Sequence, residues 1–421
     1  MPKVSIRVLG SNLEVGRSAI LVEIGGKRIL MDYGMKLVPK KEPMYPEEVK
    51  DVDAVLLTHA HVDHSGSIPL LFNGKEVPIY GIDITRDFTE LLLFDSLRVA
   101  KKRGYQLKYG AEQIKRALSV YRSVEYGIPF RIGDVRITAY NAGHIPGSAM
   151  FRLEYNGFSL LYTGDFNLKK TRLMPPADTN FPKVDVLITE STYAFREHPP
   201  RAGQEILLKE LVKNVMSKGG MPIIAGFAIG RLAEVAMALR ATGIKEQIFL
   251  DGMAREGMRI TQQYPDRVRD FKELSRISDT ITFVGGWRMR KKLIKRPSIV
   301  LTTSGMLEGG PVRYYLGEKA EDEKSAVVLT GYQIEGTDGR RLLEEGKINL
   351  EGSDLDVSMK VSQLNFSAHA SRSDIFELIK IASPDVVIPV HGEDTEKFSE
   401  EIRKMGISSF ALRDPYEEVM L

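Results

Sequence analysis

Apolar stretches and polar turns follow two different patterns along the chain. Up to about residue 190, short apolar runs are separated by two-residue turns such as Gly25-Gly26, Gly133-Asp134 and Asn156-Gly157, which predict β-hairpins. Helical spacing of apolar positions predicts helices over about 85–103 and 111–123. From about residue 200, apolar runs of strand length alternate with helical segments, which is typical of a parallel βαβ sheet. The pattern therefore predicts two architectures in one chain.

Length, cysteine content and the absence of long apolar runs limit the classes of protein to which the chain can belong. With 421 residues, 43% of them hydrophobic, the chain is long enough for two domains. It has no cysteine, which excludes disulfides and thiolate metal ligands. The start has no signal-peptide pattern and no run of 18 apolar residues occurs, so we expect a cytoplasmic protein without a membrane partner.

The charge indicates where a nucleic acid would have to bind. The formal net charge is only +3, so such a partner would need a local basic surface. Residues 287–296, WRMRKKLIKR, carry six basic residues and the only tryptophan of the chain. A charge run of this kind is also typical of a solvated helix face, and the sequence leaves both interpretations open.

Candidate metal-ligating side chains are most concentrated in the stretch VLLTHAHVDHSG, residues 55–66. His59, His61, Asp63 and His64 follow directly on an apolar run, 53–57, which predicts a buried strand. Imidazole and carboxylate groups are ligands that Zn²⁺ prefers. The alternative, a polar turn lined by histidines, gives no reason for such clustering. This stretch therefore predicts a metal site.

Further candidate ligands stand at the ends of other apolar strands. His144 in AGH, Asp165 in TGD and His391 in VHG each stand beside a glycine. A workable assignment gives one ion to His59, His61 and His144, gives the other to Asp63, His64 and His391, and lets Asp165 bridge both. Six of the seven histidines fall in a few short motifs, at positions 59, 61, 64, 144, 369 and 391. The seventh, His198, has no motif around it.

Two ions about 3.5–4 Å apart suit phosphodiester hydrolysis, because together they lower the pKa of water and neutralise a phosphate oxygen. His369 is a candidate general acid for the departing 3′-oxygen, and Glu190 could hold its imidazolium. Asp32, at the end of a strand, could orient a ligand histidine. Taken alone, each also has a structural interpretation: a core or capping histidine, a helix-start carboxylate and a turn aspartate. The glycine-rich loops after residue 220 match no nucleotide-binding P-loop or dinucleotide pattern.

These motifs together resemble a known family. HAHVDH, AGH, TGD and VHG resemble the metallo-β-lactamase superfamily, and ESTYA, FSAHA and PVHGE resemble motifs A, B and C of its β-CASP branch. The sequence is most similar to the archaeal and eukaryotic group related to the endonuclease of the cleavage and polyadenylation specificity factor.

The resemblance implies an α/β fold, in which a metallo-β-lactamase αββα sandwich, residues 1–194 and 362–421, carries an inserted β-CASP domain with a parallel sheet, residues 195–361. It implies hydrolysis of single-stranded RNA in a cleft between these domains, and a histidine at position 391 favours RNA over DNA. It implies two Zn²⁺ ions on seven ligands, with Glu190, His369 and Asp63 in catalysis and Asp32 as motif 1. The implied ligands are His59, His61, Asp63, His64, His144, Asp165 and His391.

Two departures from the family pattern bear on RNA binding. We expect the protein to lack the KH-type extension of some archaeal relatives and the C-terminal domain of the RNase J group. We therefore expect affinity to come from the cleft, with a homodimer or an RNA-processing or exosome-type complex as further partners. Relatives include endonucleases and 5′–3′ exonucleases, and the sequence does not separate them. Candidates for a 5′-phosphate pocket are Ser304, Gly305, Ser367 and Ala368.

The sequence also admits two alternatives to a ribonuclease. A small-molecule hydrolase of the glyoxalase II type fits HxHxDH alone, but has no use for Glu190, His369 or a large inserted domain. A catalytically inactive scaffold subunit would have lost ligands, whereas every ligand position is filled here.

Overall fold

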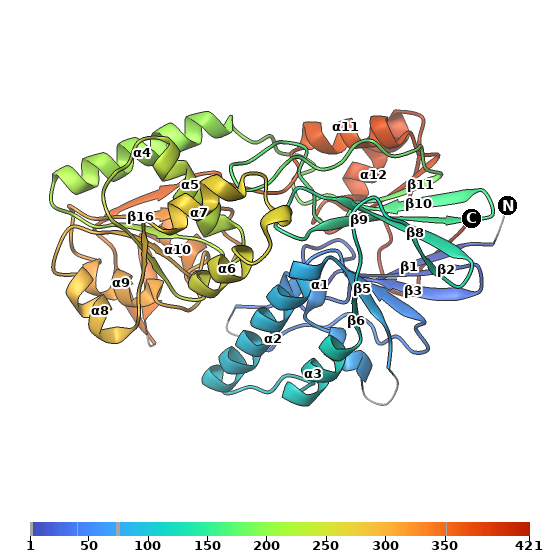
Figure 1. Ribbon diagram of the computed structural model, residues 1–421, viewed down its shortest axis with the longest axis horizontal. Helices are drawn as coiled ribbons and strands as arrows, with labels where there is room; N and C mark the ends of the chain where they lie inside the picture. Colours follow the sequence, from blue (N-terminus) through green and yellow to red (C-terminus); the bar gives the residue numbers. More distant parts are fainter. Residues whose placement is uncertain (1–2, 40, 73–75, 351) are drawn as a thin grey trace. The chain divides into compact units, whose positions relative to one another are not determined.

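The computed structural model describes residues 3–39, 41–72, 76–350 and 352–421, which form two compact units (Figure 1). Unit 1 comprises Met1–Lys170, Pro176–Glu197 and His369–Leu421, and unit 2 comprises Thr171–Pro175 and His198–Ala368. The short segment Thr171–Pro175 thus groups with unit 2 although it precedes residue 195, where we expected the inserted domain to begin.

Unit 1 contains two seven-stranded sheets. The first has the order β22 (Glu418–Met420), β1 (Ser5–Gly10), β2 (Ala19–Ile24), β3 (Lys27–Met31), β4 (Ala54–Leu56), β5 (Ile79–Gly81) and β6 (Tyr121–Ser123). The second has the order β21 (Ser408–Ser409), β20 (Val386–Val390), β11 (Val186–Glu190), β10 (Phe158–Tyr162), β9 (Ala149–Tyr155), β8 (Val135–Asn141) and β7 (Phe130–Ile132).

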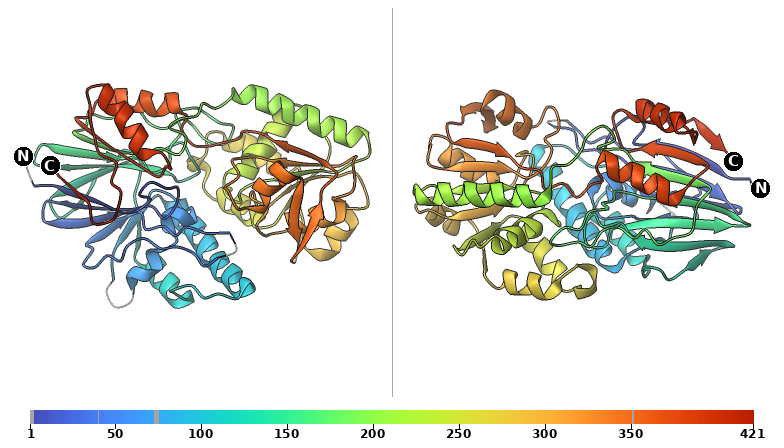
Figure 2. Two further views of the ribbon diagram at one scale, coloured as in Figure 1. Left: turned by 180° about the vertical axis from the view of Figure 1, so that it is seen from behind. Right: turned by 90° about the horizontal axis from the view of Figure 1, so that it is seen from above.

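Helices cover the outer faces of these sheets (Figures 1 and 2). The first sheet carries α2 (Asp83–Arg103), α3 (Ala111–Ser119) and the 3₁₀ helix η1 (Ile68–Phe72), and the second carries α11 (Arg372–Ala382) and α12 (Thr395–Lys404). Leu378 and Phe398 of α11 and α12 pack on Leu187 and Val387 of the second sheet. The expected αββα sandwich is therefore confirmed.

Three neighbouring parallel strands in the second sheet position candidate site residues of unit 1. Strand β11 pairs in parallel with β10 on one side and with β20 on the other. Because parallel strands end at the same edge of a sheet, the segments that follow β10, β11 and β20 emerge together. Asp165 and His391 lie in the segments after β10 and β20, and Glu190 is the last residue of β11.

The predicted hairpins are confirmed: β2 pairs with β3, β7 with β8 and β9 with β10, all antiparallel. At the first of these turns Gly25 and Gly26 both have positive φ, 57° and 69°, as a tight two-residue turn between twisted strands requires. The helix predicted over 111–123 is too long. It ends at Ser119, and Tyr121–Ser123 instead forms edge strand β6 against β5, because pairing with an open strand outweighs the weak helical pattern there.

Unit 2 is built on a six-stranded sheet in which all neighbours are parallel, which confirms the predicted βαβ architecture. Its order is β14 (Ile281–Phe283), β13 (Ile248–Asp251), β15 (Ile299–Thr302), β12 (Pro222–Ala225), β16 (Ala326–Leu329) and β19 (Lys360–Gln363). A separate hairpin joins β17 (Lys347–Leu350) to β18 (Ser353–Asp356).

The helices of unit 2 are α4 (Arg201–Ser217), α5 (Arg231–Ala241), α6 (Ala254–Thr261), α7 (Phe271–Ser278), α8 (Trp287–Leu293), α9 (Val312–Lys319) and α10 (Asp338–Glu345), with a 3₁₀ turn, η2 (Pro265–Arg267). Two buried clusters, one on each face of the sheet, hold these helices in place. Strands buried on both faces need nearly continuous apolar runs, which is the pattern that β12, β15 and β16 have. Among the described residues no helix is both long and apolar enough to cross a membrane.

Candidate metal centre

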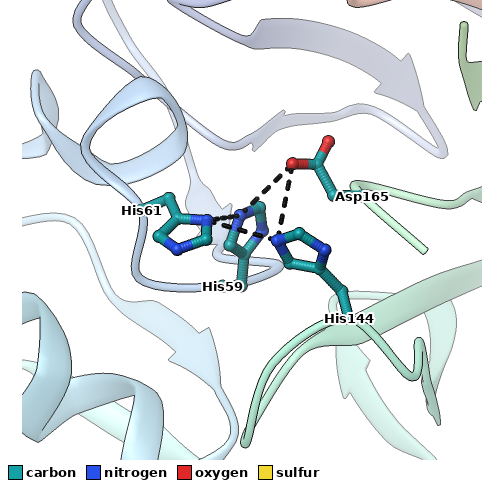
Figure 3. A group of neighbouring side chains, drawn as sticks. All are labelled: His59, His61, His144 and Asp165. Atoms are coloured by element: carbon teal, nitrogen blue, oxygen red, sulfur yellow. Dashed lines mark hydrogen bonds and ion pairs between the residues drawn. The ribbon is translucent and has the colours of Figure 1, made fainter. Parts of the chain in front are cut away.

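The first group of side chains consists of three histidines and one carboxylate (Figure 3). His61 Nδ1 lies 3.1 Å from His59 Nε2 and 3.2 Å from His144 Nε2. Asp165 Oδ2 lies 3.6 Å from His59 Nε2 and 3.8 Å from His144 Nε2. One potential ligand atom from each residue thus lies within 4.8 Å of the others, an arrangement that can surround one small cation.

A second group lies on the other side of the same carboxylate. It consists of Asp63, His64 and His391, again with ligand atoms within 4.8 Å of one another. His391 Nε2 lies 3.4 Å from Asp63 Oδ2. Asp165 Oδ1 lies 3.4 Å from His64 Nε2 and 3.4 Å from His391 Nδ1. Asp165 therefore presents one oxygen to each group.

The short helix α1 (Val62–Ser65) fixes the direction of Asp63 and His64. Its carbonyl oxygen at Asp63 packs so closely on Gly34 that a Cβ there would lie 1.7 Å from it. Only glycine allows this approach. The glycine after Asp32 and Tyr33 is thus part of the support for the motif.

A third pair of side chains adjoins Asp165. His369 Nδ1 lies 3.0 Å from Glu190 Oε2 and 3.7 Å from Asp165 Oδ2. Glu190 is buried at the end of β11, and its Oε1 accepts a hydrogen bond of 2.9 Å from the backbone N–H of Phe166. The carboxylate is therefore held in place on one side while it faces the His369 ring on the other.

Asp32 lies behind the second group. Its Oδ2 accepts a 2.7 Å hydrogen bond from His64 Nδ1 and one of 2.9 Å from the Tyr162 hydroxyl, and its Oδ1 accepts from the backbone N–H of Thr58 at 2.8 Å. This contact turns His64 Nε2 toward Asp165. Asp32 and His391 also have positive φ, 58° and 54°, a conformation that is costly for residues other than glycine and typical of functional sites.

Three hydroxyl groups in this support were not predicted from the sequence. The Thr58 hydroxyl lies 2.8 Å from Asp32 Oδ2 and 3.1 Å from His59 Nδ1. Tyr162 bonds Asp32, and the Thr192 hydroxyl lies 3.2 Å from His391 Nδ1. Thr58 and Thr192 each stand close to a motif residue in sequence, which is the signal that could have indicated them.

Burial and neighbouring charges set the protonation of the cluster. Burial, with the adjacent His64, holds the pKa of His59 well below its ordinary value, and burial lowers that of His61 to about 4. For His64, burial acts in the same direction, but the carboxylates of Asp165 and Asp32 outweigh it and raise the pKa. Burial opposes ionisation of Asp165, yet the surrounding histidines hold its pKa low. His59 and His61 are thus neutral at pH 7, the form that binds metal.

The donor atoms fit a cation. His64 Nδ1 donates a hydrogen bond to Asp32, so Nε2 is the nitrogen that faces an oxygen of ionised Asp165 at 3.4 Å. The raised pKa means that the two carboxylates favour a positive charge on this ring, and a cation on Nε2 would supply that charge in place of a proton. His64 Nε2, Asp165 Oδ1 and His391 Nε2 are buried, and none of them has a hydrogen-bond partner among the described residues. Buried polar atoms without a hydrogen-bond partner are costly, and a cation bound among these three atoms would satisfy them. Imidazole and carboxylate donors of this kind suit Zn²⁺.

The remaining predicted residues belong to unit 2. Ser304 and Gly305 lie in the loop after β15, where the Ser304 hydroxyl accepts from the backbone N–H of Gly309 at 3.2 Å. Ser367 and Ala368 end unit 2 directly before His369. His198, for which the sequence indicated no role, lies 3.0 Å from the Asn365 amide through its Nδ1.

Three family profiles match the chain in succession. Residues 21–191 match a "Metallo-beta-lactamase superfamily domain", residues 234–342 a "Beta-Casp domain", and residues 354–412 a "Zn-dependent metallo-hydrolase RNA specificity domain".

Curated relatives match over most of their length. The chain is 36% identical to "Probable RNase MJ4" of Methanocaldococcus jannaschii, covering 92% of each chain. It is 32% identical to "RNase aCSPSF2" of Saccharolobus solfataricus, covering 94% of this chain and 80% of the relative. It is also 35% identical to "Transcription termination factor FttA" of M. jannaschii, covering 96% of this chain and 69% of the relative.

A solved structure shares the fold. A protein of unknown function from Enterococcus faecalis V583 aligns over 100% of both chains with a TM-score of 0.63 and 16% sequence identity. At this identity the match indicates the fold alone.

Proposed function

The chain belongs to the β-CASP metallo-β-lactamase family of metal-dependent ribonucleases, and on this premise we propose that it hydrolyses phosphodiester bonds of single-stranded RNA with two zinc ions held in unit 1. The observation that carries the proposal is the Asp165 carboxylate, which presents one oxygen to each of two ligand groups and adjoins the His369 and Glu190 pair. This arrangement has the parts that a two-metal hydrolase requires.

We assign the ions to the two groups described above. The first would be held by His59, His61, His144 and Asp165, and the second by Asp63, His64, His391 and the other oxygen of Asp165. When bound, such ions supply an activated water near neutral pH and neutralise charge on the phosphate. Asp32 and Thr58 act as positioning residues, because their hydrogen bonds set the directions of the His64 and His59 rings.

His369 is the residue to which we assign protonation of the departing 3′-oxygen. Glu190 faces Nδ1 at 3.0 Å, so it keeps the proton on that nitrogen and stabilises the imidazolium. Nε2, on the opposite side of the ring, is then the atom that donates to the leaving group. The catalytic role of Asp63 stays a prediction; its side chain is 34% exposed, so solvent reaches it.

One cleavage assay tests the proposal. The zinc-loaded chain is incubated with a single-stranded RNA labelled at its 3′ end, carrying either a 5′-monophosphate or a 5′-hydroxyl, beside DNA of the same sequence. We expect cleavage of RNA that is lost on chelation and restored by zinc. Intact RNA after incubation with the zinc-loaded chain would contradict the proposal.

The same assay separates the two modes that the sequence leaves open. Discrete internal fragments regardless of the 5′ group indicate an endonuclease, whereas a shrinking ladder that requires the monophosphate indicates a 5′–3′ exonuclease. A 5′-phosphate pocket at Ser304, Gly305, Ser367 and Ala368 stays a prediction, as do a homodimer, an exosome-type complex and a cytoplasmic location.

A further inference from the structure

A second concentration of charge lies in unit 2, on α8 and the turn that follows it. This segment carries six basic residues, and one of them faces inward. Arg290 forms two hydrogen bonds, 2.7 and 2.9 Å, with the buried carboxylate of Asp251, which also accepts from the Tyr315 hydroxyl at 2.8 Å. Leu293 is buried in the same face of the helix. These contacts fix which side of α8 points to solvent.

The other five basic side chains are exposed: Arg288, Lys291, Lys292, Lys295 and Arg296. Within the described part of the chain, Arg290 is the residue of this segment that has an acidic partner, and none of the five exposed cations forms an ion pair. The arginines of α10, in contrast, do form ion pairs: Arg340 pairs with Glu344, and Arg341 pairs with Glu345 and Asp354. Five unpaired like charges repel one another, and an anionic partner would relieve that repulsion.

An aromatic pair lies beside these cations. Trp287, the only tryptophan, has 52% of its surface exposed, and its ring centroid lies 4.5 Å from that of Tyr314 on α9. Lys291, one helical turn later, places its ammonium 5.1 Å from the Trp287 ring centroid. The ring is thus held at the surface next to a positive charge instead of being buried in the core.

We propose that this basic face, defined as Trp287, Arg288, Lys291, Lys292, Lys295 and Arg296, binds single-stranded RNA outside the metal centre. A base stacks on Trp287 and the cations contact phosphates. Unpaired bases stack on exposed aromatic rings, and cations beside such rings are typical of single-strand binding surfaces. An acidic protein would use the charges but has no need of an exposed indole. The inference rests on the proposed function for the choice of RNA as the polyanion.

Because Trp287 is the only tryptophan, its fluorescence reports on this face directly. The zinc-loaded chain is titrated with an oligouridylate of about 16 nucleotides, long enough for one single-strand site, and the initial quenching is recorded before appreciable cleavage. We expect saturable quenching that weakens steeply with salt. Poly-L-glutamate serves as a polyanion without bases. Equal quenching by poly-L-glutamate at equal charge would overturn the inference in favour of an acidic protein partner.

A charge-matched pair of variants sharpens the test. The first replaces Arg288, Lys291, Lys292 and Lys295 by glutamine, and the control replaces four exposed lysines elsewhere in unit 2 by glutamine, at positions 213, 218, 245 and 324. We expect the first to weaken oligouridylate binding about tenfold or more and to reduce the slope of log affinity against log salt by up to about 3, at roughly 0.7 per phosphate contact. Trp287→Ala, followed by fluorescence anisotropy of a labelled oligouridylate, should weaken binding about tenfold.

The outcomes separate this inference from the proposed function. Quenching by RNA in a chain that cleaves nothing would support the basic face and contradict the ribonuclease. Cleavage without quenching, or the same loss of affinity in the control variant, would overturn the basic face.

Discussion

The metal centre of unit 1 and the basic face of unit 2 are both concentrations of titratable side chains, yet they are built in opposite ways. In the metal centre the side chains are mostly buried and hold one another: Asp32 orients His64, and Glu190 faces His369. On the basic face the cations are exposed and have no acidic partner among the described residues.

This difference predicts how each region responds to change. Buried polar groups are coupled through short contacts, so the loss of one leaves its neighbours unsatisfied and a single substitution removes most of the function. Each exposed cation contributes nearly independently to RNA binding, and solvent ions screen its charge. Substituting such cations one at a time should therefore weaken binding in small steps, and these losses should become smaller at high salt. The four predictions below test this contrast.

The largest effect is expected at Asp165, because its two carboxylate oxygens face the two proposed ligand groups. Asp165→Ala should lower the zinc content and reduce RNA cleavage by more than about 10³-fold. Zinc is measured by elemental analysis and cleavage with the labelled single-stranded RNA. Asp178→Ala is the control, since Asp178 accepts a hydrogen bond from the backbone of Asn141 and belongs to neither ligand group. Full zinc content with normal activity would show that Asp165 is not the shared ligand.

His369→Ala should separate catalysis from metal binding. We expect cleavage to slow by about 10²–10⁴-fold, the usual contribution of a general acid, while zinc content is unchanged. Glu190→Gln should cause part of the same loss, and the double variant should be little worse than His369→Ala, because the two residues act as a pair. Undiminished cleavage by His369→Ala would remove this residue from the mechanism.

Arg290→Ala breaks the buried ion pair with Asp251 beneath the basic face. It leaves the Asp251 carboxylate buried without its guanidinium, and we expect the free energy of unfolding to fall by about 3 kcal/mol, the lower end for a broken buried pair because the Arg290 side chain is 22% exposed. The urea midpoint, followed by Trp287 fluorescence, measures this.

Arg341→Ala provides the contrast for that measurement. Arg341 pairs with Asp354 and Glu345 on the surface, where solvent screens the attraction, so the midpoint should shift much less. Equal shifts in the two variants would contradict the distinction between coupled and independent charges.

The smallest effect within the metal centre is expected at Asp32, which contacts the proposed ligand His64 and belongs to neither proposed ligand group. Asp32→Asn should weaken zinc affinity by about 10–100-fold, as measured by competition with a chelator, because the His64 ring loses its charged partner. Tyr162→Phe removes only one hydrogen bond to the same carboxylate and should change the affinity less. An unchanged affinity in Asp32→Asn would show that helix α1 alone orients His64.

Much of the metal centre could be predicted from the sequence because its residues follow apolar strands. His59 and His61 come shortly after β4, and Asp165, Glu190 and His391 lie at or just beyond the ends of three strands that are parallel neighbours. A run of apolar residues at every position predicts a strand buried on both faces. The residue that follows the run is then expected where the strands of the sheet end. The alternation of strand and helix after residue 200 predicted the parallel sheet of unit 2 for the same reason.

What could not be predicted depends on pairing between distant segments. Tyr162 reaches Asp32 only because β10 and β3 lie in facing sheets, and no local pattern indicates that contact. Likewise, the sequence gives no reason to separate the six basic residues of 287–296 from one another. In the structure Arg290 differs from the others because it bonds Asp251 at the end of β13. The helix expected over 111–123 was wrong in its last part because an open sheet edge lay beside it.

The pairing of β11 with β20 has a consequence for the biosynthesis of this protein. Thr192, after β11, and His391, after β20, lie 199 positions apart, and their side chains meet in the finished site. A chain growing on a ribosome therefore has Glu190 and most of the histidines long before His391 emerges from the exit tunnel. Under the proposed assignment, hydrolysis needs the last strands of the sandwich, so a partly synthesised chain lacks one of the proposed ligands while it is still held on the ribosome with its own messenger RNA.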